Sequence, residues 1–157
     1  MEDLMICPFF DGLAGEVSAL IGRVLMEVNI RDYPESDLAE FAAYYSPETV
    51  LALAREGQTY VALAGERVVG CGSIVPLEAD GECEIRAVFV LPEDEGQGVG
   101  RTIMEVLEAD PSFTKARRVL VSASITAHPF YAKLGYRYAG GVPVCEDNDH
   151  YWMEKVH

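Results

Sequence analysis

The sequence predicts a single α/β or α+β domain in which a mixed sheet is covered by helices. The first observation is the order of its segments: helical stretches, a meander of strands, then helix, strand, helix and two more strands. The second is length, because 157 residues suit one domain at roughly 100–200 residues per domain. The third is composition, since a chain that is 50% hydrophobic is not disordered. We therefore expect one domain over residues 1–157.

The first third of the chain has mostly helical patterning. Apolar residues recur at helical spacing over 13–28, after Asp11 as a candidate N-cap. Residues 29–37 are polar and predict a loop, and 38–45 predict a short helix. Another helix is expected over 46–57, because it begins with Ser-Pro-Glu and ends at a glycine.

Strand-like segments fill much of the rest. A two-residue Gly-Glu turn joins the first two as a hairpin, and an acidic loop and a glycine-rich segment follow the third. Asp-Pro ends the helix that begins in this segment, and a short helix over 129–134 ends at a glycine. The expected strands cover 59–64, 67–75, 82–91, 118–125, 136–144 and 150–156.

Charge and cysteine content exclude several classes of protein. A net charge of −14 argues against binding to nucleic acid, whose partners carry clustered Lys and Arg, and would favour cationic ligands. No segment approaches the roughly 18 apolar residues that span a bilayer. The 4 cysteines form no close pair, so we expect free thiols in a reducing cytoplasm, and no zinc site. The Asp-rich segment around 146–150 is interpreted as a turn rather than as a set of metal ligands.

The most informative stretch is EGQGVGR, at residues 95–101 between a strand and a helix. Glycines let the backbone approach a ligand, and a helix N-terminus adds unpaired N–H groups and about half a positive charge. Together they predict a phosphate or pyrophosphate site. Two nucleotide motifs do not fit, because no Lys follows Gly100 and Arg101 replaces the third glycine of a dinucleotide fingerprint. A glycine-rich connection without a ligand is the alternative.

Two motifs resemble those of the GNAT N-acetyltransferase superfamily. Residues 84–101, EIRAVFVLPEDEGQGVGR, resemble motif A: a strand, a short loop and [Gln/Arg]-Gly-x-Gly-x-[Gly/Ala] at a helix start. Residues 129–136, PFYAKLGY, resemble motif B, and one helix and one strand separate the two motifs as in the family. The resemblance covers nearly the whole chain. It implies a mixed, mostly antiparallel central sheet of about six to seven strands flanked by helices, splayed between strands 4 and 5.

The resemblance also implies acetyl-CoA as cosubstrate. One departure concerns Glu95, where the family usually has Gln or Arg: a carboxylate near a pyrophosphate is unfavourable unless it faces water or pairs with a cation such as Arg101. The implied cofactor-binding residues are Glu95, Gly96, Gln97, Gly98, Val99, Gly100 and Arg101 of the loop and helix start, and Val88, Phe89 and Val90 of strand 4.

Proton transfer needs an acid for the departing thiolate and a base for the attacking amine. The resemblance assigns the acid role to Tyr131, for which aromatic packing is the alternative. Glu84 is the candidate base, acting directly or through water, because it lies four residues before Val88 and so on the same strand face at period two. Glu82 has the same parity and is a rival. His128 could cap a helix or act as a base.

The acceptor is expected to be a small-molecule amine or a basic peptide. Asp32, Glu35 and Asp37 in one segment and Glu146, Asp147 and Asp149 in another would suit a cation, although an acidic protein has acidic loops everywhere. Aromatic residues could line the acceptor pocket or belong to the core: Phe9, Phe10, Tyr33, Tyr44 and Tyr45. A homodimer is one option. The alternative function is a non-catalytic acyl-CoA-binding sensor or interaction domain of the same fold.

Overall fold

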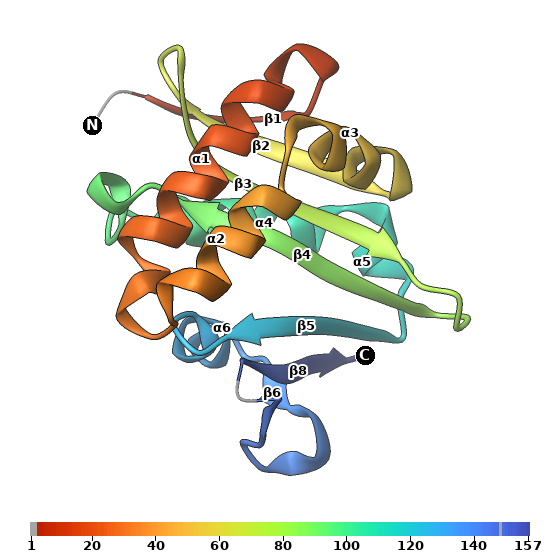
Figure 1. Ribbon diagram of the computed structural model, residues 1–157. Coiled ribbons are helices and arrows are strands. Elements are labelled where there is room, and N and C mark those ends of the chain that lie inside the picture. Colours follow the sequence, from red (N-terminus) through yellow and green to blue (C-terminus); the bar gives the residue numbers. More distant parts are fainter. Residues whose placement is uncertain (1–2, 148) are drawn as a thin grey trace.

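The structure is a computed structural model that describes residues 3–147 and 149–157 (Figure 1). Within them, the strands are β1 (Leu4–Pro8), β2 (Gln58–Ala64), β3 (Arg67–Pro76), β4 (Glu82–Val90), β5 (Arg118–Ser124), β6 (Arg137–Tyr138), β7 (Cys145–Glu146) and β8 (His150–Val156). They form one sheet in the order β1-β2-β3-β4-β5-β8-β6, with β7 also paired to β8. Neighbouring strands run antiparallel except β4 and β5, which are parallel. The predicted fold class is confirmed.

Helices cover both faces of the sheet. They are α1 (Ala14–Glu27), α2 (Glu35–Tyr44), α3 (Pro47–Glu56), α4 (Val99–Ala109), α5 (Pro111–Lys115) and α6 (His128–Lys133). We call the face that carries α1 and α2 the front face and the face that carries α4 the rear face; α4 lies behind the sheet in Figure 1. Gly70 and Gly72 of β3 let α4 pack closely, because a Cβ at either would lie 2.8 Å from the Ile103 side chain.

The strand register assigns side chains to these faces. Val75, Glu84, Leu120 and Glu154 pair in turn across β3, β4, β5 and β8, so their side chains share one face. Gly72 faces α4 at the rear. Val75 lies three residues further along β3, so its side chain, and with it the whole set, is on the front face.

Four parts of the secondary structure differ from the sequence prediction. β1 and α5 were not expected, and α2 begins at Glu35, inside the expected loop, where acidic residues favour the first turn of a helix. The expected strand over 136–144 is only Arg137–Tyr138, followed by a turn in which Gly140 and Gly141 have φ of 82° and 86°. Positive φ angles interrupt an extended strand. Among the described residues, no helix combines the length and hydropathy needed to cross a bilayer.

Candidate active site

β4 lies beside β5 only over its first half. Residues 82–85 pair with 118–121, and beyond this point β4 has no partner on the β5 side among the described residues. The β3–β4 register shifts between Cys71 and Ser73, and Ala87 has φ of 54°, which is uncommon for a residue with a side chain. This β-bulge bends β4, and the backbone groups along the free edge of residues 86–90 are left available to a ligand.

A cleft of about 880 Å³ opens where the two strands separate. Its walls come from β4, the end of β5, the α1–α2 region, the glycine loop and α6. Sites for small molecules and cofactors have volumes of roughly 300–1,000 Å³. The cleft is therefore large enough for a cofactor-sized ligand.

The glycine loop forms one end of this cleft. Gly98 is the N-cap of α4, and Gly96 and Gly98 have φ of 77° and 82°, which favour glycine. A Cβ at either position would meet nothing within 4 Å, so the surrounding space is open. No side chain caps α4, and Thr102 donates from N and Oγ1 to the Gly98 carbonyl, at 2.9 and 2.8 Å. The N–H groups of residues 99–101 have no acceptor within the helix and can bind an anion.

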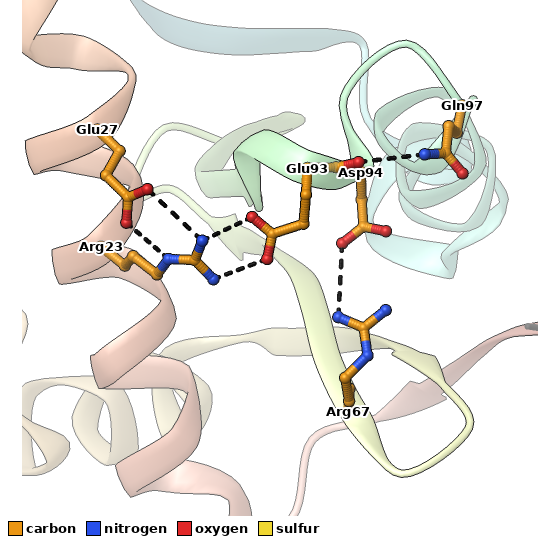
Figure 2. Close-up of polar contacts among 6 residues, drawn as sticks. All are labelled: Arg23, Glu27, Arg67, Glu93, Asp94 and Gln97. Carbon is orange, nitrogen blue, oxygen red and sulfur yellow. Dashed lines mark hydrogen bonds and ion pairs between the residues drawn. The ribbon is translucent and has the colours of Figure 1, made fainter. Parts of the chain in front are cut away.

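An ion-pair network anchors the segment before the glycines, as Figure 2 shows. Arg23 of α1 donates to both carboxylate oxygens of Glu93, at 2.7 and 2.6 Å, and to Glu27 at 2.6 Å. The hydrogen bonds to Arg23 hold the pKa of Glu93 below its usual range. Gln97 donates to the Glu93 carbonyl at 3.1 Å, and its side chain does not line the cleft. The loop is therefore tied to α1, and the Arg23 charge is already shared by two carboxylates.

The next two acidic residues differ from each other. Asp94 is buried, with Oδ2 3.8 Å from the Arg67 guanidinium and no hydrogen-bond partner in the described part of the chain (Figure 2). Glu95 is exposed, so its carboxylate is solvated, which is one of the conditions for an anion site beside it. Arg101 is exposed as well, and no ion pair joins it to Glu95 within residues 3–147 and 149–157.

The predicted residues of β4 line the cleft as well. The Phe89 ring packs edge-on against Tyr45, with centroids 5.9 Å apart. Val90 lies beside the helix start, where a Cβ at Gly100 would be 3.7 Å from its Cγ2. The structure thus brings the predicted cofactor-binding residues other than Gln97 to one cleft.

Tyr131 lies in α6, is buried and lines the cleft. Its ring packs edge-on against Phe130 and Tyr136, at centroid distances of 5.2 and 5.9 Å. Burial raises the pKa of Tyr131 above its ordinary value, so the hydroxyl keeps its proton. Packing and a proton-donating role are compatible here, because the packing holds the ring in place.

Glu84 also lines the cleft, but not on the face expected from the sequence. The Val88 side chain is near Gly72 on the rear face, whereas Glu84 is on the front face. The prediction that both share a face is wrong, because the bulge at Ala87 adds one residue and reverses the alternation. Arg86 donates to Glu84 at 3.0 Å, so this carboxylate is ion-paired.

The two other candidate bases are engaged elsewhere. Glu82 accepts from Arg118 at 3.5 Å and does not line the cleft. His128 is not a helix cap, because Ala127 occupies that position without a side-chain bond; its Nδ1 lies 2.7 Å from the Tyr138 hydroxyl.

The far end of the cleft contains polar residues for which no catalytic role was expected from the sequence. The Tyr33 hydroxyl donates to the Asp149 carbonyl and accepts from the Ile125 N–H at 2.8 Å. The Asp149 carboxylate lies 2.5 Å from His150 Nδ1. These residues come from three segments far apart in the chain; the sequence singled out Tyr33 as an aromatic and Asp149 as an acidic candidate for the acceptor pocket, and did not predict their contact.

A family profile described as an acetyltransferase (GNAT) domain matches residues 55–138, which include β2–β5, the glycine loop and α6. The chain belongs to the GNAT acetyltransferase family. An uncharacterized N-acetyltransferase of Bacillus subtilis (strain 168), YjcF, is 33% identical over 90 residues, or 57% of this chain. That match covers 63% of YjcF, which is less than two thirds of its length.

Solved GNAT structures share the whole fold. A GCN5-related N-acetyltransferase from Rhodopseudomonas palustris has a TM-score of 0.81 and 23% identity, covering 100% of this chain and 98% of that one. The PaiA N-acetyltransferase from Thermoplasma acidophilum, solved with coenzyme A, has a TM-score of 0.83 and 14% identity, covering 99% of both chains. At these identities the likeness concerns the fold. In this GNAT chain the free β4 edge and the unpaired N–H groups of α4 are the features that suit an acyl-CoA.

Proposed function

We propose that this chain is an N-acetyltransferase that moves an acetyl group from acetyl-CoA to a primary amine by direct attack. One observation carries the proposal: a single cleft contains the helix N-terminus with unpaired N–H groups, the free edge of β4 and the Tyr131 hydroxyl. An anion site, an extended groove and a proton donor are what transfer from a CoA thioester requires.

Acetyl-CoA supplies the activated acyl group. Backbone N–H groups of residues 96–101 bind the pyrophosphate in this proposal, and the main chain of residues 88–90 binds the pantetheine arm and polarises the thioester carbonyl. Tyr131 gives its proton to the departing sulfur. Glu84 is the candidate base from the sequence, and its carboxylate is ion-paired with Arg86.

The acceptor is a small-molecule amine or a basic peptide in this proposal. Asp149, Glu84 and several aromatic side chains line the part of the cleft away from the glycine loop. A net charge of −14 attracts cationic acceptors at low ionic strength. The four cysteines are free thiols, as expected, and suit the cytoplasmic location that we propose.

The second candidate is an acyl-CoA-binding sensor without turnover. Glu95 favours it, because an exposed carboxylate stands beside the anion site and Arg23 is engaged by Glu93 and Glu27. A sensor would bind acetyl-CoA and release no thiol.

Calorimetric titration with acetyl-CoA, followed by a thiol-release assay over a panel of amines, tests both candidates. We expect binding and amine-dependent thiol release. Binding without release over alkylamines, polyamines, aminoglycosides and basic peptides would support the sensor. Absence of binding at millimolar acetyl-CoA would overturn both.

A further inference from the structure

Asp149 and His150, at the start of β8, lie in the wall of the cleft. Asp149 Oδ1 is 2.5 Å from His150 Nδ1. An ionised carboxylate only accepts hydrogen bonds, so Nδ1 carries the hydrogen and Nε2 of the neutral ring has the free lone pair. Nε2 is buried and has no hydrogen-bond partner among the described residues. A carboxylate that orients an imidazole and leaves Nε2 unpaired is the arrangement of a general base.

The sheet register places His150 on the front face. His150 pairs with Ser124, and the β5–β8 register is regular, so His150 shares the front face with Glu154 and Glu84. Tyr131 belongs to the rear face, because neighbouring Phe130 packs against Gly100 of α4 and Tyr136 donates to Glu108 of α4 at 2.7 Å. A base and an acid on opposite faces of the splay can act on opposite sides of one thioester.

Surrounding groups hold the imidazole in place. The Tyr33 hydroxyl bonds the Asp149 carbonyl and the Ile125 N–H, which fixes the turn against the end of β5. The Trp152 ring packs edge-on against His150, at a centroid distance of 5.4 Å. This support sets the ring orientation independently of a bound substrate.

Acidic and neutral side chains lie next to His150. Asp149 bonds the ring, Glu146 of β7 lies opposite His150 in the strand register, and Tyr33 is the titratable group that holds the turn from the α1–α2 segment. Ser124, opposite on β5, is neutral. Glu84 differs, because Arg86 donates a hydrogen bond to its carboxylate at 3.0 Å and so occupies one of its oxygens.

We propose that His150 is the general base of amine acetylation and that Asp149 is its positioning residue; this rests on the proposed function. The alkylammonium first gives one proton to Nε2 and becomes a neutral amine. The nitrogen then forms a C–N bond with the acyl carbon while the C–S bond breaks, and the sulfur leaves with the bonding electron pair and takes the Tyr131 proton. Tyr131 recovers the second proton of the nitrogen through solvent and the imidazolium releases its proton, so the net products are the amide, the free thiol and one proton.

The test uses His150→Gln, His150→Ala, Asp149→Asn and Glu84→Gln in the 157-residue chain, with His157→Gln as the matched control. His157 bonds the Ala116 carbonyl and does not line the cleft. The acceptors are one alkylamine found in the panel and its fluorinated analogues, whose amine pKa falls with little change in size. Calorimetry with acetyl-CoA is run on every variant.

His150→Gln is expected to lower kcat/KM for the alkylamine by about 10²–10⁴-fold, with unchanged acetyl-CoA affinity. The loss shrinks along the fluorinated series, because an amine that is already neutral needs less help from a base. Asp149→Asn gives a smaller loss with the same trend. Added imidazole restores part of the activity of His150→Ala, and His157→Gln behaves as wild type.

Each other outcome overturns a distinct statement. If the wild type turns over and His150→Gln has the same kcat/KM, His150 is not the base. The same conclusion follows if His150→Gln lowers kcat/KM equally for all the amine analogues. The same amine-dependent loss in Glu84→Gln alone assigns the base to Glu84. Failure of the wild type to acetylate any amine overturns the proposed function itself.

Discussion

The two ends of the cleft are built in different ways. The glycine-loop end is made of backbone from one continuous segment, with Gly98 capping α4 and unpaired N–H groups in the next turn. The far end of the cleft is made by distant segments, and the Tyr33 side chain there bonds Asp149, 116 residues away. A backbone site depends on local conformation, whereas a side-chain site depends on strand register and loop closure.

The ends also differ in how their charges are balanced. Arg23 and Arg67 near the glycine loop face Glu93 and Asp94, so the anion site relies on backbone dipoles and Arg101. At the other end, Asp149 holds an imidazole that has a free nitrogen. The first end is organised to bind, and the second to take up a proton.

The largest expected loss of acetyl-CoA affinity comes from Gly98→Val at the glycine-loop end. A valine at φ 82° is strained by roughly 1–2 kcal/mol, and its side chain covers the N–H groups of the first turn. We expect acetyl-CoA affinity, measured by calorimetry, to fall by more than about 100-fold, which corresponds to about 2.7 kcal/mol.

Gly141→Val is the matched control. Gly141 has φ of 86°, a Cβ there would meet nothing within 4 Å, and it does not line the cleft. Gly141→Val should lose about as much thermal stability as Gly98→Val and bind acetyl-CoA normally. Equal losses of binding in both variants would mean that strain, not the anion site, explains the effect at Gly98.

The next largest effect is a loss of kcat in Tyr131→Phe, since Tyr131 lies between the two ends of the cleft. Loss of the hydroxyl should lower kcat by about 100-fold while acetyl-CoA affinity stays the same. Because burial raises the pKa of Tyr131, its proton stays bound as pH rises, so kcat should not decline from about pH 7 to 9 through its loss. Exposed Tyr44→Phe is the control. Weaker affinity with unchanged kcat would show that Tyr131 binds and does not donate.

The same contrast explains what the sequence could predict. The glycine loop and Tyr131 stand in short motifs that resemble those of the GNAT family, so their positions around one cleft followed from that resemblance. The bulge at Ala87 carries no glycine to signal its positive φ, and it reversed the expected face of Glu84 relative to Val88. Tyr33 and Asp149 meet through long-range closure that no local pattern records.

Tyr33→Phe tests the side-chain-built end. It removes two hydrogen bonds and leaves the Ile125 N–H without its partner, which should lower the free energy of unfolding by about 1–2 kcal/mol. Loosening the Asp149–His150 turn should also lower kcat/KM for the amine, and leave acetyl-CoA affinity unchanged.

Tyr60→Phe is its control, because the Tyr60 hydroxyl donates to Asp110 at 2.7 Å away from the cleft. Denaturant unfolding should show a comparable loss of stability with normal kinetics. If Tyr33→Phe and Tyr60→Phe have the same kinetics, the turn does not depend on Tyr33 for its catalytic position.

The smallest effect is expected for Glu95→Gln, which removes an exposed negative charge beside the α4 N-terminus. Acetyl-CoA affinity should rise about two- to fivefold at low ionic strength, and the gain should vanish at high salt because exposed charges are screened. Glu78→Gln, in the β3–β4 connection, removes the same charge from a position that does not line the cleft. An equal gain in Glu78→Gln would trace the effect to net charge. A loss of affinity in Glu95→Gln would mean that the carboxylate supports the loop, and that this end, too, depends on a side chain.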